Sequence, residues 1–353
     1  MTAIRRSSMT AGTAGTAGTA GALAALGLAA LVACRSGAAT IDSGGAVGAT
    51  VAAPLELGPG TSYEAAAVIR LPETEPEDHD ALHNVYVLSP QIVSGSEPHG
   101  EEAFEILAAK GIRTILSVDG KVPDAELAAR HGMKYVHVPI QYKGITEDEV
   151  ERIAKTFREQ QAPFYVHCFH GKHRGPAAAA IGRLVLDGAP REEAIAEMRQ
   201  WCGTSSAYEG LYATIATAPM PTAEETGRLD WDFPAAEPLD GVGGAMVEIA
   251  RGFDHLKAAS SNDWQPNPGH PDLNAPNEAV KLADLFDRMR VLDEVLAQDD
   301  DFRAKLEDTR VRAGALREAL LGLDAGEVAV EQADLAFRSL SSSCTACHEV
   351  YRN

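Results

Sequence analysis

The residues best suited to chemistry lie between Ala162 and Gly188. An apolar, β-type run ends there in a loop that carries Cys168, and Arg174 follows six residues later. Pro176 then suits the first turn of a helix, where its missing N–H is not needed. A strand, a tight loop and a helix N-terminus form an anion site, because backbone N–H groups and the helix dipole supply positive potential. The pattern predicts phosphoryl transfer through a cysteinyl phosphate.

The types of the two central residues fit this chemistry. The field that holds a phosphate also favours the thiolate of Cys168 over its thiol. The planar guanidinium of Arg174 can hold two phosphate oxygens at once. The sequence His-Cys-x-x-Gly-x-x-Arg resembles the signature loop of the protein tyrosine and dual-specificity phosphatases, and the resemblance covers about residues 84–216. It implies an α/β domain that hydrolyses phosphate monoesters, with a phosphate-binding loop made of His167, Phe169, His170, Gly171, Lys172 and His173.

The resemblance also implies a general acid that protonates the leaving oxygen. In the family this is an Asp on a loop upstream of the cysteine, but the corresponding residues 139–144 contain no Asp. Asp119 is the first candidate, because it ends a strand expected beside the Cys168 loop. Asp148 is the second candidate and Glu147 the third. The alternative for each is an ordinary solvated residue of a turn or a first helical turn.

A second departure from the family is Gly175, where many members carry a Ser or Thr that helps the thiolate leave. Hydrolysis of the phosphocysteine is then slow, or the domain binds phosphate without turnover. The resemblance assigns His167 the role of ordering the loop. His170, Lys172 and His173 either set the electrostatics of the pocket or lie exposed on a polar loop.

A second chemical motif, Cys-x-x-Cys-His, occupies Cys344, Cys347 and His348. It is the attachment motif of a c-type haem, with thioethers at both cysteines and the histidine as axial ligand. The motif ends the last of four helical patterns whose apolar residues are spaced three and four apart, which predicts a four-helix bundle. A thioredoxin-like redox pair is the alternative, but that motif is expected at a helix start in a βαβ unit.

The bundle and its motif resemble the cytochrome c′ and cytochrome c556 family over about residues 243–353. The resemblance implies one covalent haem whose second axial position is reached from the first helix. Met246 fits that position, and its alternative is plain core packing. His255 lies nine residues later, on the opposite helix face, so the two cannot both face the haem. No other metal is expected.

Residues 1–33 have the pattern of a signal peptide, with Arg5 and Arg6 before a short apolar stretch. The sequence Leu-Val-Ala-Cys that ends at Cys34 resembles a bacterial lipobox, which implies lipidation of that cysteine. The alternative is an ordinary secretory signal. We therefore expect an exported protein, lipid-anchored at the periplasmic face of a bacterial membrane. Export agrees with the haem motif, since c-type haem is attached outside the cytoplasm.

The 353 residues predict two domains with connecting segments. The expected order is a flexible tether (35–80), the phosphatase-like domain (84–217), a linker (218–243) and the haem domain (244–353). Strands and helices alternate in the first domain, which predicts a mainly parallel sheet flanked by helices. The net charge of −20 argues against binding to nucleic acid.

The sequence therefore predicts an exported phosphatase-like enzyme fused to a monohaem cytochrome for electron transfer or for gas or redox sensing. The expected partners are a phosphorylated substrate, a redox partner, the membrane through the lipid anchor, and a second copy through the helical bundle. One alternative is a haem protein whose first domain only binds phosphate, motivated by Gly175 and the missing acid. Sulfur transfer at Cys168 is a third and weaker hypothesis.

Overall fold

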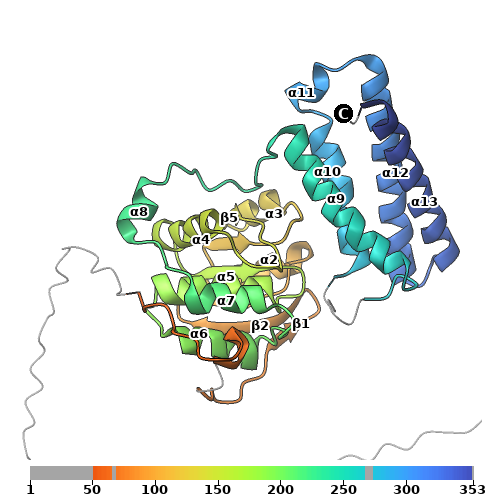
Figure 1. Cartoon of the computed structure of the whole chain (residues 1–353). Helices are drawn as coiled ribbons and strands as arrows, with labels where there is room; N and C mark the ends of the chain where they lie inside the picture. The colour runs from red at the N-terminus through yellow and green to blue at the C-terminus, as the bar shows by residue number, and fades with distance from the viewer. Residues whose placement is uncertain (1–50, 66–68, 267–272, 352–353) are drawn as a thin grey trace, which may run out of the picture. The chain divides into compact units, whose positions relative to one another are not determined.

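The computed structural model describes residues 51–65, 69–266 and 273–351, which form an α/β fold followed by an all-helical region (Figure 1). The strands of the α/β fold are β1 (Glu77–His79), β2 (Leu82–Ser89), β3 (Ile92–Gly95), β4 (Thr114–Ser117), β5 (Lys134–His137) and β6 (Phe164–His167). Its helices are α1 (Ser62–Ala65), α2 (Gly100–Ala109), α3 (Ala125–Arg130), α4 (Glu147–Glu159), α5 (Arg174–Val185), α6 (Arg191–Ala196), the π-helical segment η2 (Glu197–Trp201), α7 (Glu209–Thr217) and α8 (Ala223–Arg228).

The six strands form one sheet in the order β1-β2-β3-β6-β4-β5. The pairs β3–β6, β6–β4 and β4–β5 are parallel, whereas β1, β2 and β3 are joined as antiparallel neighbours. The predicted mainly parallel sheet is therefore confirmed. Because β6 lies between β3 and β4, the segments that leave these three strands emerge at the same edge of the sheet.

Each face of the sheet is covered by helices and has its own apolar core. Helices α2 and α3 bury residues such as Phe104 and Leu127 on one face, against Tyr135 and Tyr165. Helices α4, α5 and α7 form the larger core on the other face. All twelve residues of α5 are buried, so this helix, which follows the Cys168 loop, is fixed along its whole length.

The segment 51–80, which the sequence analysis placed in a flexible tether, is ordered against the α/β fold where the structure describes it. Val51, Leu55 and Leu57 pack against the larger core, and the Leu55 N–H donates to the carbonyl of Ala216 at 2.8 Å. The prediction was wrong for this part. These apolar residues are too scattered along the chain to show a period, so only tertiary packing reveals them.

The expected linker also contacts the α/β fold. Helix α8 begins with a capping box at Thr222, and Phe233 packs against the larger core. The His137 N–H donates to the Pro234 carbonyl at 2.9 Å, so this part of the chain runs beside the edge strand β5.

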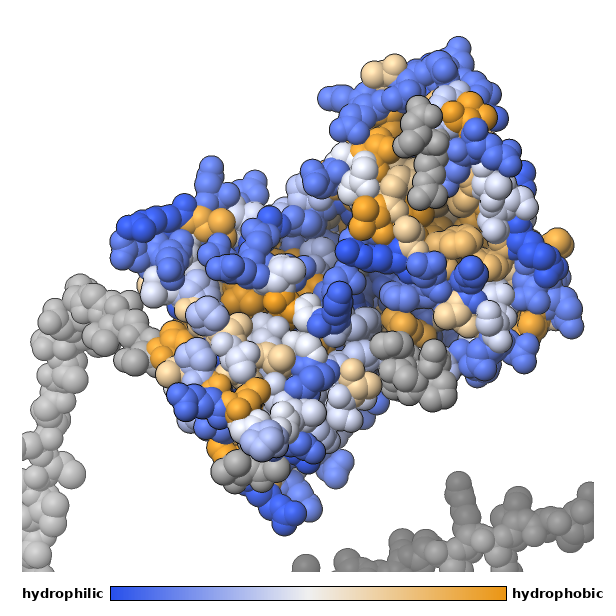
Figure 2. All heavy atoms as spheres, viewed as in Figure 1, coloured by the Kyte–Doolittle hydropathy of each residue, from blue (hydrophilic) through white to orange (hydrophobic). Residues whose placement is uncertain are grey.

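Where the structure describes it, the all-helical region contains four long helices and one short one: α9 (Gly241–Ser260), α10 (Ala275–Met289), α11 (Asp293–Leu296), α12 (Asp300–Asp324) and α13 (Val330–Tyr351). Helix α10 packs closely against both α9 and α12, and α12 packs against α13. Helices α9 and α13 approach less closely. Their contact includes a stack of Phe253 on Phe337, with 5.1 Å between ring centroids. Figure 2 shows apolar side chains in this region between the polar side chains of its outer surface.

Candidate functional site

The Cys168 loop begins where β6 ends, between the ends of β3 and β4. Gly95 of β3 and Ser117 of β4 both pair with His167, the last residue of β6. Cys168 follows at once and is buried, with 3% of its surface exposed. The segment after β4 brings Asp119 to the same edge, as the sequence predicted from neighbouring strands.

Hydrogen bonds to the outward-facing carbonyl groups of the Cys168 loop hold it in shape. They leave its N–H groups facing inward, as an amide cradle. Four of its carbonyl oxygens accept hydrogen bonds from neighbouring segments: His167 from the Val118 N–H, Phe169 from the Glu97 N–H, Gly171 from the Asn84 side chain, and Lys172 from the Thr204 hydroxyl. The N–H of a planar trans peptide points opposite to its C=O. The amides that follow these carbonyls, those of Cys168, His170, Lys172 and His173, therefore point toward the inside of the loop.

Two glycines allow this tight path. Gly171 has φ +70, and a Cβ there would lie 2.2 Å from the carbonyl carbon of Gly95. A Cβ on Gly175 would lie 3.1 Å from the Cys168 nitrogen, so the start of α5 packs directly on the loop. Backbone atoms thus crowd the position after the arginine. This crowding is a steric reason for Gly175 at a position where many members of the resembled family carry Ser or Thr.

Helix α5 begins at Arg174, two residues before the start expected at Pro176. Its N-cap residue His173 makes no side-chain capping bond, and its first turn contains no acidic residue. The first-turn N–H groups of a helix have no acceptor within the helix. The N-terminus of α5 therefore offers donors and positive potential to an anion at the loop.

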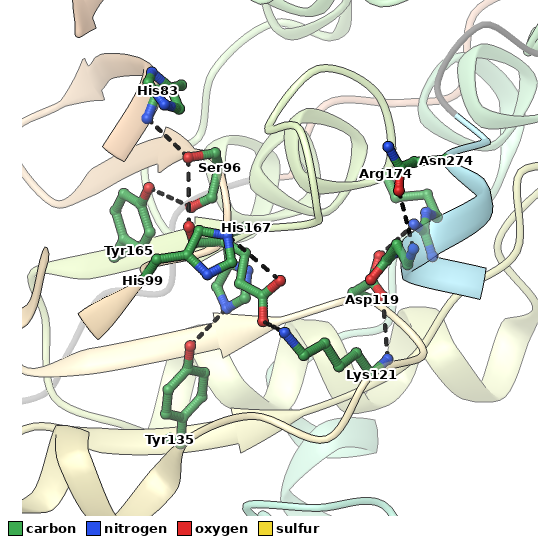
Figure 3. Close-up of polar contacts among 12 residues, drawn as sticks. His83, Ser96, His99, Asp119, Lys121, Tyr135, Tyr165, His167, Arg174 and Asn274 are labelled. Atoms are coloured by element: carbon green, nitrogen blue, oxygen red, sulfur yellow. Dashed lines mark hydrogen bonds and ion pairs between the residues drawn. The ribbon is translucent and has the colours of Figure 1, made fainter. Parts of the chain in front are cut away.

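Arg174 is the centre of a buried polar group at this site (Figure 3). Its Nη2 donates to Oδ2 of Asp119, and the pair is almost fully buried, at 4% and 2% exposure. The same Nη2 donates to Oη of Tyr142 at 2.9 Å. The Nε of Arg174 is buried and has no hydrogen-bond partner within the described chain. A buried N–H without a partner is costly, so this atom is available to an oxygen of a bound anion.

The pairing fixes the charge of Asp119. Burial raises the pKa of the carboxyl, but the charges of Arg174 and Lys281 and the hydrogen bond from the Lys121 N–H together outweigh it, and the pKa lies well below its usual range. Asp119 is therefore an anion at neutral pH in this arrangement. A general acid must carry a proton, so Asp119 as placed here is a partner of Arg174 rather than a proton donor. Its assignment as the acid remains a sequence prediction that this geometry does not favour.

Three histidines beside the site are neutral. Burial lowers the pKa of His167 to about 3, and its Nε2 lies 2.8 Å from the Tyr135 hydroxyl. Burial also lowers the pKa of His173 to about 3 and that of His137 to about 4. His137 Nδ1 accepts from the Glu237 N–H, and its Nε2 lies 2.7 Å from the Asp119 carbonyl. His137 thus contacts the backbone of Asp119 directly and helps to position the segment that carries it.

The other acid candidates lie elsewhere. The side chain of Asp148 is 58% exposed and pairs with Arg152 in the first turns of α4, and Glu147 is exposed on the same helix. Of the loop residues whose role was left open, Lys172 is exposed, whereas His173 is buried and accepts from the Ser205 N–H at 3.2 Å. The structure thus brings Asp119 to Arg174, but neither Asp148 nor Glu147.

Three contributors to the site were not found from the sequence. Tyr142 lies in the loop that was searched only for an Asp. Asn84 has φ 53 and binds the Gly171 carbonyl, which no local pattern indicates. Glu97 binds the loop through its N–H, which donates to the Phe169 carbonyl, and its Oε1 forms an ion pair with Lys121 Nζ at 2.8 Å. A search for any ionisable or phenolic side chain in residues 139–144 would have found Tyr142.

The second predicted site lies in the helical region, between α9 and α13. A cavity of about 830 Å³ is lined there by Met246, Phe302, Cys344, Cys347 and His348, with further apolar residues of α9. This set joins both cysteines and the histidine of the motif to the proposed second axial ligand. The cavity is large and largely apolar, and His348 is part of its lining, so the residues fit a haem.

His255 is not part of this cavity lining, because its Nδ1 lies 3.0 Å from Oε2 of Glu278 on α10. This agrees with the prediction that Met246 and His255 face different ways. Within the described ranges, no group of three or more His, Cys, Asp or Glu side chains could hold a metal ion directly. No helix in those ranges is long and apolar enough to cross a membrane. The signal peptide and Cys34 lie outside the described residues.

The family described as "Swiss Army Knife protein, DSP-PTPase phosphatase domain" matches residues 84–211. These residues form a dual-specificity phosphatase-like domain. The match covers the sheet from β2 onward, the Cys168 loop and the start of α7. It does not extend into the helical region, whose family stays a prediction from the motif.

Among curated proteins, the phosphatase-like domain is similar to the dual specificity protein phosphatase TpbA of Pseudomonas aeruginosa. The two are 24% identical over 123 residues, which is 34% of this chain and 56% of TpbA, so the chain spans little more than half of that relative. The crystal structure of P. aeruginosa TpbA matches with 21% identity and a TM-score of 0.34, covering 40% of this chain and 87% of that one. A putative phosphatase from Shewanella putrefaciens matches with 20% identity and a TM-score of 0.31, covering 38% and 91%.

Proposed function

We propose that the phosphatase-like domain hydrolyses phosphate monoesters through a phosphocysteine at Cys168. The observation that carries this proposal is the buried Arg174 beside the cradle, with an Nε that lacks a partner. A bound phosphate would receive that N–H together with the inward amides of the loop. Charge-assisted bonds of this kind suit an oxyanion and not a neutral ligand.

The proposed reaction has two steps, formation of the phosphocysteine and its hydrolysis. The Cys168 thiolate attacks phosphorus, the new S–P bond forms, and the ester P–O bond breaks as the leaving oxygen gains a proton. Water then attacks phosphorus, the S–P bond breaks, and phosphate leaves with the thiolate restored. Arg174 and the loop amides hold the equatorial oxygens, on which charge is spread in the transition state.

The test is steady-state hydrolysis of an aryl phosphate by the full chain and by Cys168→Ser and Arg174→Lys. Cys168→Ser should abolish turnover, and Arg174→Lys should lower kcat/KM by about 10²–10³-fold, as the loss of an oxyanion donor does. Phosphate binding without turnover in the unmodified chain would instead support the alternative of a phosphate-binding domain.

We propose further that Cys344 and Cys347 hold one haem c in the cavity between α9 and α13, with His348 and Met246 at its iron. The shared lining of this one cavity by all four residues supports the proposal. When bound, the haem would supply reversible electron transfer or gas binding. The chain itself would contribute the two thiols, the side chains of His348 and Met246 as iron ligands, and an apolar wall that includes Phe302.

Covalent haem is tested by denaturing the full chain, expressed with a haem-attachment system, and measuring its mass and absorbance. The haem should stay with the unmodified chain and be lost from Cys344→Ala/Cys347→Ala. Free haem extracted from the denatured unmodified chain would contradict the proposal. Export and lipidation at Cys34 remain proposals as well, and Cys34→Ser should release the protein from the membrane fraction.

A further inference from the structure

The loop that lacks the expected Asp is built around a tyrosine. Residues Gln141 and Gly144 form an isolated antiparallel bridge, so Tyr142 stands at the tip of a closed turn. Gly210 of α7 packs against this turn so closely that a Cβ there would meet the Lys143 carbonyl oxygen at 1.7 Å. The turn therefore has a fixed position relative to α7 and the sheet core.

The Tyr142 side chain is held beside the arginine by two ring contacts. It stacks on Tyr208, with 4.8 Å between centroids and 30° between planes. It also contacts Arg174, whose guanidinium carbon is 4.3 Å from the ring centroid. Tyr142 is half-buried and lines a cavity together with Arg174 and Gln141, so the tyrosine and the arginine border the same ligand-accessible space.

The polarity of the contact restricts the direction of the phenolic O–H bond. Because Nη2 of Arg174 donates to Oη, the hydrogen of Tyr142 must point away from the guanidinium. The same guanidinium would stabilise a phenolate at this oxygen. Asp119, the alternative donor, is already bound to Arg174 as an anion.

From this arrangement we infer that Tyr142 is the general acid of the reaction, in the place that an Asp occupies in the phosphatases the domain resembles. This inference rests on the proposed function at Cys168. As the ester P–O bond breaks, the Tyr142 O–H bond breaks and its proton passes to the leaving oxygen. In the second step, the phenolate takes a proton from the water that attacks phosphorus, so the tyrosine is restored.

A general acid matters most when the leaving group is poor. The experiment measures kcat/KM of the full chain with phenyl phosphate and with 2,4-dinitrophenyl phosphate, whose leaving group needs no proton. This parameter reports steps up to release of the alcohol, so slow hydrolysis of the phosphocysteine does not hide the effect. Tyr142→Phe keeps the ring and its stacking. Tyr63→Phe is the matched control, since Tyr63 packs edge-on against Tyr212, outside the site.

Tyr142→Phe should lower kcat/KM for phenyl phosphate by about 10²–10⁴-fold and for the dinitrophenyl ester by less than about tenfold. Tyr63→Phe should leave both values unchanged. An equal loss with both esters would mean that Tyr142 only positions Arg174, and no loss would leave it without a role. If Asp119→Asn, and not Tyr142→Phe, showed the large loss with phenyl phosphate and the small loss with the dinitrophenyl ester, Asp119 would be the proton donor. Each of these three results would overturn the inference.

The same assay separates this inference from the proposed function. If Cys168→Ser is inactive while Tyr142→Phe behaves like the unmodified chain, only the inference fails. If Cys168→Ser keeps its turnover, or the unmodified chain cleaves neither ester, the proposed function fails and the inference fails with it.

Discussion

Replacing Asp119 by Asn tests the buried ion pair that organises the candidate active site. The pair is almost fully buried, so the substitution leaves the Arg174 charge without its counter-ion. Removing one partner of a buried ion pair costs about 3–5 kcal/mol, and an Asn that keeps one hydrogen bond to Arg174 places the cost near the lower end. For a domain of this size, a loss of about 3 kcal/mol lowers Tm by roughly 6–12 °C.

An added anion should reverse part of this loss. Inorganic phosphate bound at the loop would give Arg174 a new partner in Asp119→Asn, whereas Asp119 already supplies one in the unmodified chain. Binding at 100 times Kd adds about 2.7 kcal/mol to a folded state. The midpoint of thermal unfolding of the full chain is measured by circular dichroism, with and without phosphate. Phosphate should raise the Tm of the variant more than that of the unmodified chain.

Asp148→Asn is the matched control, because it makes the same chemical change in an exposed pair with Arg152. Exposed pairs contribute about 0–1 kcal/mol, so its Tm should hardly change. Equal shifts in the two variants, or a Tm of Asp119→Asn that phosphate does not raise, would refute the reasoning from the buried pair.

Three further predictions concern other parts of the chain. The pKa of His137 is about 4 when folded and about 6.5 when unfolded, so the unfolded chain binds the proton first and stability falls with pH from 6.5 toward 4. Between pH 7 and pH 5 the loss from this residue is about 2 kcal/mol, and denaturant unfolding of His137→Gln should show a correspondingly smaller pH slope. Gly171→Ala should abolish phosphate binding in calorimetry, because its Cβ would overlap the Gly95 backbone, whereas Gly132→Ala, also at positive φ but in open space, should still bind. Met246→Ala should open the sixth position of the proposed haem, so CO should change the reduced spectrum of the variant and not that of the unmodified chain.

The position of the two proposed catalytic residues follows from local sequence, because one strand–loop–helix unit holds Cys168 and Arg174 together. The approach of Asp119 was also predictable, since neighbouring parallel strands end at one edge of the sheet. Its charge was not, because the sequence does not show that Arg174 binds it in a buried pair. Protonation depends on burial and partners that only the folded chain brings together.

The packing of the segment 51–80 and the position of Tyr142 also depend on contacts that local sequence does not show. Leu55 and Leu57 pack on the core without any helical or strand period around them, so composition alone made the segment resemble a tether. Tyr142 was missed because the sequence was searched for the residue type of the family. Its stacking on Tyr208 joins residues far apart in the chain, and no local pattern encodes that contact.

The most direct measurement is to quench the full chain during turnover of a radiolabelled aryl phosphate and locate the label by peptide mapping. The label should lie on the peptide that contains Cys168 and be absent in Cys168→Ser. Label on any other residue, or turnover that survives in Cys168→Ser, would contradict a covalent phosphocysteine in this domain.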